Sequence, residues 1–242
     1  MRIFLAGATG VIGKRLVPLL RKAGHDVIGT TRSAAKVDAL RAAGVEAVVV
    51  DVFDAPALTR AVSAARPDVV MHQLTDLPPG LDPGRMAEAG PRNARIRSEG
   101  TENLVRAALA SGARRLIAQC IAWMYAPGRQ PYVEGAPLDI NAQGARAVTV
   151  AGVVALERLT LSSPPLEGVV LRYGHLYGPG TGAEWADAPS LHVDAAAAAA
   201  LLAIEKAHAG IYNIAEPSGY LSTEKAEREL GFDPSFRLEA QV

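Results

Sequence analysis

Three glycines at intervals of three residues lie between an apolar run and a helical segment near the start of the chain. Gly7, Gly10 and Gly13 follow the apolar residues 2–6, and apolar residues then recur at helical spacing over 11–22. Glycines in this pattern let the backbone turn sharply and approach a pyrophosphate, while the helix N-terminus presents unpaired N–H groups. This context predicts a dinucleotide site, with a purely structural turn as the alternative. Its expected residues in this turn are Gly7, Thr9, Gly10, Val11, Ile12 and Gly13.

The residues after the second expected strand bear on the choice between NAD(H) and NADP(H). A carboxylate there usually binds the ribose hydroxyls of NAD(H), whereas the 2′-phosphate of NADP(H) requires a cation. The strand at 27–30 is followed by Thr31, Arg32 and Ser33, so a guanidinium stands where a carboxylate would. We therefore expect NADP(H) to be favoured; a solvated arginine that leaves the preference open is the alternative.

Two further strand ends complete the expected cofactor site. Asp51 and Val52 follow the third strand, and we expect the Asp51 carboxylate to hold the edge of the adenine. Gln73 and Leu74 follow the fourth strand. The carboxyl ends of neighbouring parallel strands meet at one edge of a sheet, which is where such cofactors bind.

The elements that must position these residues alternate along the chain. Short β-branched runs alternate with longer amphipathic segments, which is typical of βαβ units. The strands are nearly all apolar, as expected when helices cover both faces of the sheet. These patterns predict an α/β fold, a Rossmann-like doubly wound parallel sheet. Strands are expected at 2–6, 27–30, 47–50, 68–73, 116–119, 168–172 and 211–214, and helices at 11–22, 33–43, 91–111, 145–161, around the alanines 195–200, and at 222–230.

Composition excludes several other classes of protein. Because 25 basic residues balance 25 acidic ones, a nucleic-acid binder is not expected, and the partner is expected to be a small molecule. Cys120 is the single cysteine, so it forms neither an intramolecular disulfide nor a cysteine zinc site, and no metal-ligand spacing occurs elsewhere. The chain has no signal-peptide run and no apolar stretch of ~18 residues, so we expect a cytoplasmic protein without membrane contact.

Seven short motifs in this order resemble those of the extended short-chain dehydrogenase/reductase family, which includes NAD-dependent nucleotide-sugar epimerases and dehydratases. The resemblance covers nearly the whole chain and implies the same nucleotide-binding fold. The motifs occupy 7–13, 51–54, 68–72, 100–104, 171–180, 192–194 and 225–234.

The catalytic groups that the resemblance implies are missing. The family uses a tyrosine, a lysine four residues later on the same helix face, and a serine or threonine at the end of strand five. None of the five lysines has a tyrosine four residues before it. Alignment of the helix on Glu157 places Thr149 and Val153 at the tyrosine and lysine positions, and Ala122 stands at the hydroxyl position. The chain therefore resembles the atypical members of the family.

The part of the chain that would hold a substrate is short. Residues 181–190 and 216–221 are the connections where relatives with a nucleotide-sugar pocket carry long insertions. The resemblance then implies a substrate smaller than a nucleotide sugar. We expect a single NAD(P)-binding domain over 1–242, with a reduced C-terminal substrate lobe from about 175–192 and 215–242. A homodimer through 91–111 and 145–161 is also possible, although packing on the sheet explains the same apolar faces.

Tyr125 and His175 are the residues expected to replace the missing catalytic groups. Tyr125 follows strand five, where a nearby charge could lower its pKa; a pocket wall with its hydroxyl bonded to the backbone is the alternative. His175 stands where relatives often have a substrate-binding asparagine, and it could donate a hydrogen bond or a proton. His72 is expected to be structural, Cys120 to pack as a small hydrophobe, and Asp76 to be a solvated loop carboxylate.

Three functions remain open at this point. The first is an NADP(H)-dependent oxidoreductase that acts on a small carbonyl or alkene. The second is a redox-neutral isomerase, dehydratase or cyclase that keeps the cofactor fold as a scaffold. The third is a catalytically silent protein that senses NADP(H) and acts through a partner. Fold analogy does not separate these three.

Overall fold

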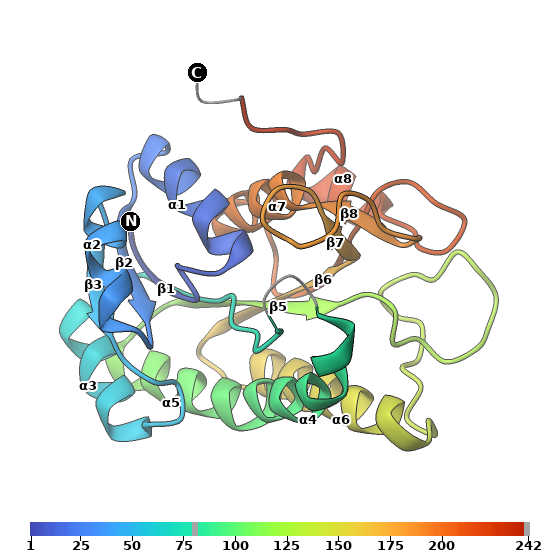
Figure 1. Cartoon of the computed structure of the whole chain (residues 1–242), viewed down its shortest axis with the longest axis horizontal. Coiled ribbons are helices and arrows are strands. Elements are labelled where there is room, and N and C mark those ends of the chain that lie inside the picture. The colour runs from blue at the N-terminus through green and yellow to red at the C-terminus, as the bar shows by residue number, and fades with distance from the viewer. Residues whose placement is uncertain (79–81, 240–242) are drawn as a thin grey trace.

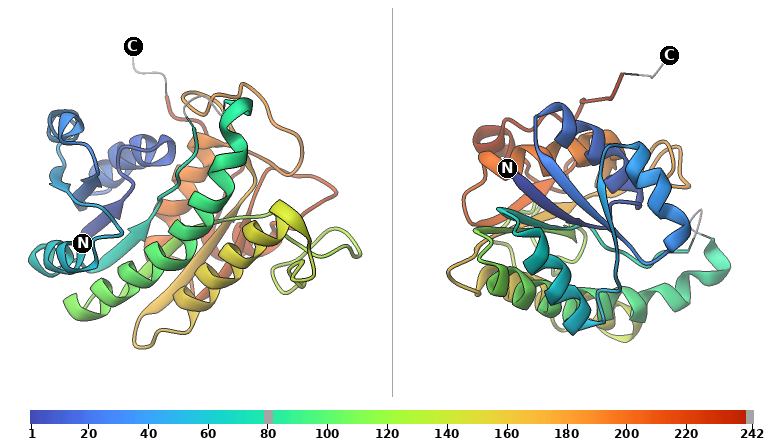
Figure 2. Two further views of the ribbon diagram at one scale, coloured as in Figure 1. Left: turned by 60° about the horizontal axis from the view of Figure 1, so that its bottom comes forward. Right: turned by 90° about the vertical axis from the view of Figure 1, so that its left-hand side faces the viewer.

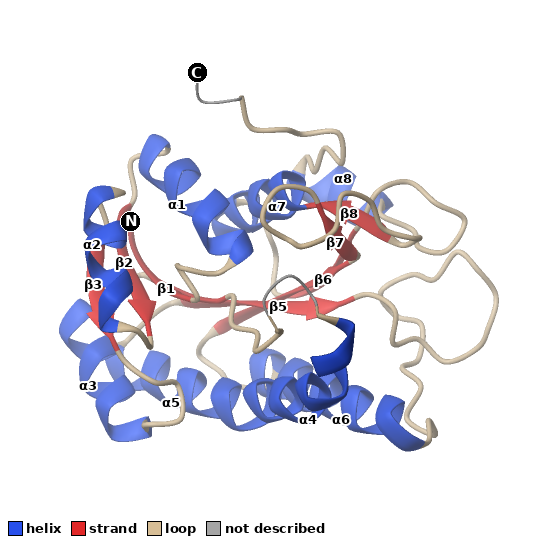
Figure 3. Cartoon of the chain, in the orientation of Figure 1, coloured by secondary structure: helices blue, strands red, loops and turns tan. Residues whose placement is uncertain are grey.

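A seven-stranded parallel sheet forms the centre of the molecule, in a computed structural model that describes residues 1–78 and 82–239. Its strand order is β3-β2-β1-β4-β5-β6-β9, and Figure 3 shows the strands in red between two layers of helices. The doubly wound parallel sheet expected from the sequence is confirmed. The strands are β1 (Arg2–Ala6), β2 (Asp26–Thr31), β3 (Glu46–Val49), β4 (Val69–His72), β5 (Arg115–Ile121), β6 (Glu167–Tyr173) and β9 (Gly210–Ile214).

Helices cover both faces of this sheet, as Figure 1 shows. One face is covered by α1 (Val11–Lys22), α2 (Val37–Ala42), α7 (Val193–Glu205) and α8 (Glu224–Leu230). The other face is covered by α3 (Ala55–Ala65), α4 (Met86–Arg95), α5 (Thr101–Ser111) and α6 (Gly144–Leu161). Shorter elements are the 3₁₀ turns η1 (Ala34–Lys36) and η3 (Pro83–Arg85), and the π-helical turn η4 (Ile96–Gly100) that joins α4 to α5.

Alternation along each strand explains why two helical layers are needed. In β1, Ile3 and Leu5 belong to the core under α1 and α7, while Phe4 belongs to the core under α3 and α5. Successive strand side chains point to opposite faces, so an all-apolar strand buries both only if helices lie on each side. The alanines of α7 are small enough to let this helix approach the sheet and α1 closely, and most of them are fully buried.

The sheet changes direction of winding at β1, which lies between β2 and β4. Leu5 pairs with Gly29 of β2 on one side, and Ala6 pairs with His72 of β4 on the other. A crevice therefore opens at the carboxyl ends of these three strands, which is where ligands bind in open α/β sheets.

Some elements differ from the sequence-based expectation. Helix α3 was not expected, although Asp54 caps it by accepting the Ala57 N–H at 3.0 Å. The long helix begins at Met86 rather than at Pro91, which lies inside α4. A second sheet of two parallel strands, β7 (His175–Tyr177) and β8 (Ser190–His192), was also not expected. It lies within the segment assigned to a substrate lobe.

Candidate functional site

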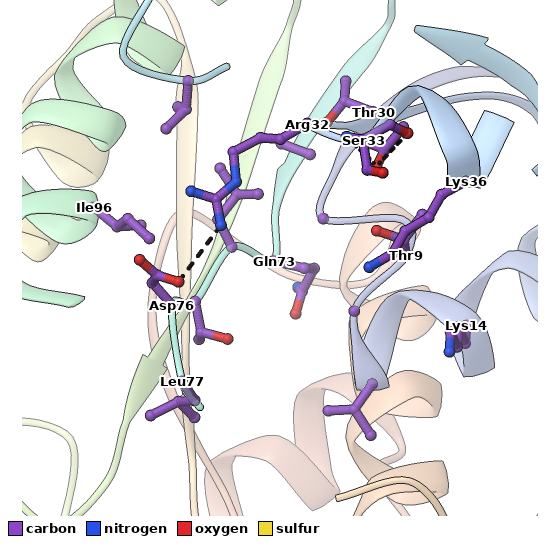
Figure 4. Close-up of a pocket in the computed structure, with 18 of the residues that line it drawn as sticks. Thr9, Lys14, Thr30, Arg32, Ser33, Lys36, Gln73, Asp76, Leu77 and Ile96 are labelled. Atoms are coloured by element: carbon purple, nitrogen blue, oxygen red, sulfur yellow. Dashed lines mark hydrogen bonds and ion pairs between the residues drawn. The ribbon is translucent and has the colours of Figure 1, made fainter. Parts of the chain in front are cut away.

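A cavity of about 970 Å³ lies at the crevice between β1, β2 and β4 (Figure 4). Its wall combines the glycine turn, the end of β2, the segment after β4 and a short part of the loop after β7. Its volume is at the upper end of the range for small-molecule and cofactor sites. The size and the position are those expected for a dinucleotide.

The glycine turn brings the backbone close to the end of the sheet at this cavity. Gly7 has a φ of +99°, and a Cβ there would lie 2.5 Å from the Gln73 carbonyl oxygen. At Gly13 a Cβ would lie 2.2 Å from the Gly7 carbonyl oxygen, so helix α1 approaches the turn too closely for any side chain. These close approaches explain two of the three glycines.

The N-terminus of α1 is open toward the cavity. Gly10 is its N-cap, no described side chain caps it, and its first turn carries no acidic residue. Unpaired N–H groups and the helix dipole therefore favour an anion here. Gly7, Thr9, Gly10 and Val11 line the cavity, whereas Ile12 and Gly13 are buried. Lys14 and Arg15, which the sequence analysis did not single out, add positive charge to the same wall.

The end of β2 supplies further cations. Arg32, Ser33 and Lys36 line the cavity, and the Ser33 N–H donates to Thr31 Oγ1 at 3.1 Å. Figure 4 shows Arg32 extended toward Asp76, with Lys36 on the side of Thr9. Lys36 on η1 was missed because its position depends on how the chain turns after β2. This wall therefore presents an ammonium as well as the expected guanidinium.

Asp76 contacts two arginines at the mouth of the cavity. Its carboxylate lies 3.5 Å from Arg32 Nη2 and 3.4 Å from Arg92 Nε. Its backbone N–H donates to Asn93 Oδ1 at 2.9 Å, which ties the segment after β4 to α4. Both arginine pairs are partly exposed, so each contributes less than about 1 kcal/mol to folding stability.

Apolar residues line another part of the cavity wall. Val52 and Leu74, two of the expected cofactor residues, line the cavity together with Phe53 and Ile96. The Arg95 guanidinium lies over the Phe53 ring, 3.9 Å from its centroid. Apolar side chains of this kind suit the flat face of an adenine. Asp51 lies outside this wall, exposed to solvent, and its carboxylate accepts the Phe53 N–H at 2.9 Å.

Gln73 is buried in the cavity wall with its amide unsatisfied. It is 5% exposed, and neither its Nε2 nor its Oε1 has a hydrogen-bond partner among the described residues. The Tyr173 hydroxyl is likewise buried without a partner in the described part of the chain. Burial raises the pKa of Tyr173, and the nearby Gln73 amide opposes this shift. Buried polar groups are nearly always paired, and Gln73 lines the cavity, so its unpaired amide and the open helix N-terminus fit a bound dinucleotide.

Tyr125 lies inside the molecule rather than at the cavity. It is 2% exposed; its hydroxyl donates to Asn213 Oδ1 at 2.6 Å and accepts from Arg172 Nη1 at 2.8 Å. Arg172 in turn donates two hydrogen bonds to the Glu157 carboxylate at 2.7 and 2.8 Å. Burial raises the pKa of Tyr125, and the Arg172 guanidinium opposes this shift. The hydroxyl is thus held by side chains, not by the backbone.

His175 stacks on Trp123. The two ring centroids are 4.0 Å apart, with an angle of 33° between the planes. His175 Nδ1 lies 3.2 Å from the Asp187 carbonyl oxygen, which favours a proton on Nδ1. Trp123 packs against the apolar cluster that contains Val153, the position of the family lysine. Both rings are half-buried.

The positions of the family's catalytic groups hold no acid or base. Val153 and Ala122 are fully buried, and the Thr149 hydroxyl donates to the Ala145 carbonyl oxygen at 3.3 Å. His72 is buried against the Thr101 hydroxyl at 3.2 Å. Cys120 is also buried, which raises the pKa of its thiol to about 12. Because both side chains are buried, neither is open to a substrate.

Two searches of the described residues bear on other kinds of site. Across residues 1–78 and 82–239, no group of histidine, cysteine and carboxylate side chains could hold a metal ion. In the same part of the chain, no helix is long and apolar enough to cross a membrane.

Comparison with known sequences places the chain among nucleotide-cofactor proteins. Residues 3–189 match the model of the NAD dependent epimerase/dehydratase family. The chain is 52% identical over 185 residues to a 3-diazoavenalumate denitrifying reductase of a Streptomyces species. That match covers 75% of this chain and 58% of the relative, so the chain spans less than two thirds of the relative's length.

Comparison with solved structures shows the same fold. The UDP-glucose 4-epimerase of Thermotoga maritima is similar with a TM-score of 0.77 and 20% identity, covering 98% of this chain and 94% of that one. The UDP-glucose 4-epimerase of Thermus thermophilus, solved with NAD, is similar with a TM-score of 0.71 and 22% identity, covering 97% and 85%. At these identities the likeness concerns the fold alone.

Proposed function

Because the chain belongs to the NAD dependent epimerase/dehydratase family, we propose that it is an NADPH-dependent reductase of a small, electron-poor acceptor. The observation that carries this proposal is a dinucleotide cavity with cations at its β2 end and no acid or base at the family's catalytic positions. The cavity supports binding of the cofactor. The missing groups restrict which acceptor it can reduce.

The preference for NADPH rests on the charge at the end of β2. Arg32, Ser33 and Lys36 line the cavity there, and β2 itself ends in two buried threonines rather than a carboxylate. A 2′-phosphate would bring a dianion to this wall, where a guanidinium and an ammonium can bind it. NADH lacks that phosphate and would gain little from either cation.

The choice of acceptor rests on the proton balance. A dihydronicotinamide held in this cavity would supply a hydride. An arenediazonium ion that accepted the hydride at its ring carbon would become the arene and release N₂, without taking up a proton. Carbonyl reduction, in contrast, needs an acid to protonate the oxygen. The name of the Streptomyces relative describes a reductase that acts on a diazo compound. We therefore propose an aromatic diazo compound as the substrate class of this chain.

An isotope experiment tests this proposal. The protein is incubated with 4-methoxybenzenediazonium and NADPH that carries deuterium at the transferred C4 position. We expect protein-dependent loss of the 340 nm absorbance, release of N₂ and one deuterium on the carbon that lost the nitrogens. Unlabelled NADPH in D₂O should give unlabelled product. Label from D₂O, or loss of NADPH no faster than without protein, would reject hydride transfer to the diazo carbon.

Reduction of a small carbonyl or alkene is the second candidate, and His175 favours it. The imidazole is half-buried and lies at the carboxyl end of the sheet, so it could donate the proton that a carbonyl requires. In that case small carbonyl compounds should consume NADPH, and His175→Gln should slow the reaction by ~10²-fold or more. If His175→Gln were as fast as the native protein, His175 would not be the acid that protonates the carbonyl.

A further inference from the structure

We propose that Trp123, His175 and Trp185 form a subsite that binds a planar aromatic cation. The inference rests on the proposed reductase function. It derives the chemical class of the substrate from residues that do not line the cofactor cavity. The chain has 2 tryptophans in all. Both belong to this subsite.

The first part of the subsite is the Trp123–His175 stack. Trp123 follows β5 and His175 follows β6, two neighbouring strands whose carboxyl ends lie at the same edge of the sheet. Their rings are 4.0 Å apart and half-buried. A hydrogen bond between His175 Nδ1 and the Asp187 carbonyl oxygen holds the imidazole in place. This pair is therefore an oriented aromatic surface on the substrate side of the sheet.

The second part is the loop between β7 and β8, which joins the cofactor cavity to this stack. At its start, Pro179, Gly180 and Thr181 line the cavity. At its end, the Pro189 carbonyl oxygen accepts the His175 N–H at 2.6 Å. Trp185 lies between these two anchors in the chain. The loop thus places a tryptophan in the chain between the cofactor cavity and the aromatic stack.

The exposure of Trp185 needs an explanation. Its side chain is 71% exposed, although an indole is one of the largest apolar groups in a protein. The loop that carries it is held at both ends, since the Gly178 N–H donates to the Ala183 carbonyl at 2.8 Å and the Asp187 carbonyl contacts His175. An exposed indole on a loop whose backbone is hydrogen-bonded to His175 is suited to cover a flat ligand.

The negative charge of the loop favours a positively charged ligand over a neutral or a negatively charged one. Glu184 and Asp187 flank Trp185, and residues 178–191 contain no lysine, arginine or histidine. Arg15 contacts the loop at the Pro179 carbonyl oxygen, at 3.3 Å, which is the cofactor end. Aromatic faces attract cations, tryptophan most strongly, and the carboxylates add to this attraction. An arenediazonium ion is flat, aromatic and positively charged, and its neutral product would be bound less tightly.

The two tryptophans provide the readout. The native protein, saturated with NADP⁺, is titrated with phenyltrimethylammonium, an unreactive aromatic cation, and its tryptophan fluorescence is recorded. We expect saturable quenching, with weaker binding of tetramethylammonium and of benzenesulfonate. Trp185→Leu, followed through Trp123, should raise the dissociation constant by about 2-fold to 30-fold. Glu184→Gln combined with Asp187→Asn should also raise it.

A matched control separates the subsite from a general change in the protein. Val49→Ala removes an exposed apolar side chain on β3, at the other edge of the sheet, and should leave the dissociation constant unchanged. Equal binding of benzenesulfonate, or an unchanged dissociation constant in Trp185→Leu, would overturn the subsite. Calorimetric binding of NADPH, measured on the same variants, tests the cofactor site separately, so failure of either proposal can be recognised.

Discussion

Arg32 bears on cofactor choice through a charge that can be removed without disturbing the core. Its guanidinium is about half exposed and pairs with Asp76 at 3.5 Å, so it can exchange this carboxylate for a 2′-phosphate. Arg32→Ala should weaken NADPH binding about 10-fold or more and leave NADH binding within about 2-fold, because only NADPH carries the phosphate. Calorimetry with both cofactors measures the difference. Arg41→Ala, which removes an exposed arginine of α2, is the control; equal losses for both cofactors would contradict this role.

Tyr125 illustrates how burial changes the role of a residue. We predict that Tyr125→Phe lowers the free energy of unfolding by about 1–3 kcal/mol, since Asn213 and Arg172 each lose a buried partner. Turnover of the folded variant should stay within about 3-fold of the native rate. Urea denaturation and single-turnover kinetics test the two parts. A rate reduced ~10²-fold with native stability would instead place this hydroxyl in the chemistry.

His72 should make folding stability depend on pH. Burial, with a smaller contribution from Arg97, lowers its pKa from 6.5 to about 4. Below pH 6.5 the unfolded chain therefore takes up a proton that the native imidazole does not, so this contribution to stability falls as the pH falls toward 4. The total effect is about 3 kcal/mol.

Denaturation of native protein and of His72→Asn between pH 5 and 7.5 isolates this effect. The free energy of unfolding should depend less steeply on pH in the variant than in the native protein, by up to about 1.4 kcal/mol per pH unit. His208→Asn, which replaces an exposed histidine, should keep the native slope. Parallel slopes in the native protein and in His72→Asn would show that His72 does not titrate in this range.

At the scale of elements, helix α3 has a start signal in the sequence. The periodicity of strands and helices alone did not reveal it. Asp54 precedes the helix, Pro56 lies in its first turn, and Leu58 and Val62 are buried on one face. A cap, an early proline and apolar spacing together indicate a helix start. The helix matters for the site because it places the turn of Val52 and Phe53 in the cavity wall.

Loss of the Asp54 cap should destabilise helix α3. Asp54→Ala should lower the free energy of unfolding by about 1 kcal/mol, because the first turn of α3 loses an acceptor for the Ala57 N–H. Asp26→Ala, which removes an exposed carboxylate 3.9 Å from Arg21, should cost less. Thermal unfolding measures both. If Asp54→Ala and Asp26→Ala were equally stable, the Asp54 cap would contribute nothing to the stability of the protein.

A network of side chains joins three elements beneath the substrate side of the sheet. Glu157 of α6 pairs with Arg172 of β6. Arg172 and Asn213 of β9 are both hydrogen-bonded to the hydroxyl of Tyr125, which follows β5. A buried ion pair of this kind gives little net stability but costs several kcal/mol when one partner is removed. Its position suggests that it orients the segment after β5, including Trp123. The short connections 181–190 and 216–221 leave this segment as a main wall of the proposed substrate site.

At the scale of the whole molecule, we propose that the outer face of α5 and α6 binds a second copy of the chain. Figure 2 shows these helices side by side on one face of the sheet. Leu109 and Leu161, in the last turns of α5 and α6, are 39% and 38% exposed. We expect a homodimer through this face in light scattering, and a monomer for Leu109→Glu combined with Leu161→Glu. Val49→Glu should stay dimeric. A monomeric native protein would exclude this interface.

The sequence by itself determined the doubly wound sheet and the glycine turn, and it placed a cation after β2. These features depend on residues adjacent in the chain: strand alternation, helical spacing and the turn between them act over a few residues. The tertiary structure decided which distant side chains meet. It buried Tyr125 against Arg172, brought Asp76 to Arg32, and stacked Trp123 on His175. Loop side chains take their direction from elements packed around them, and those contacts are long-range, so no local pattern records them.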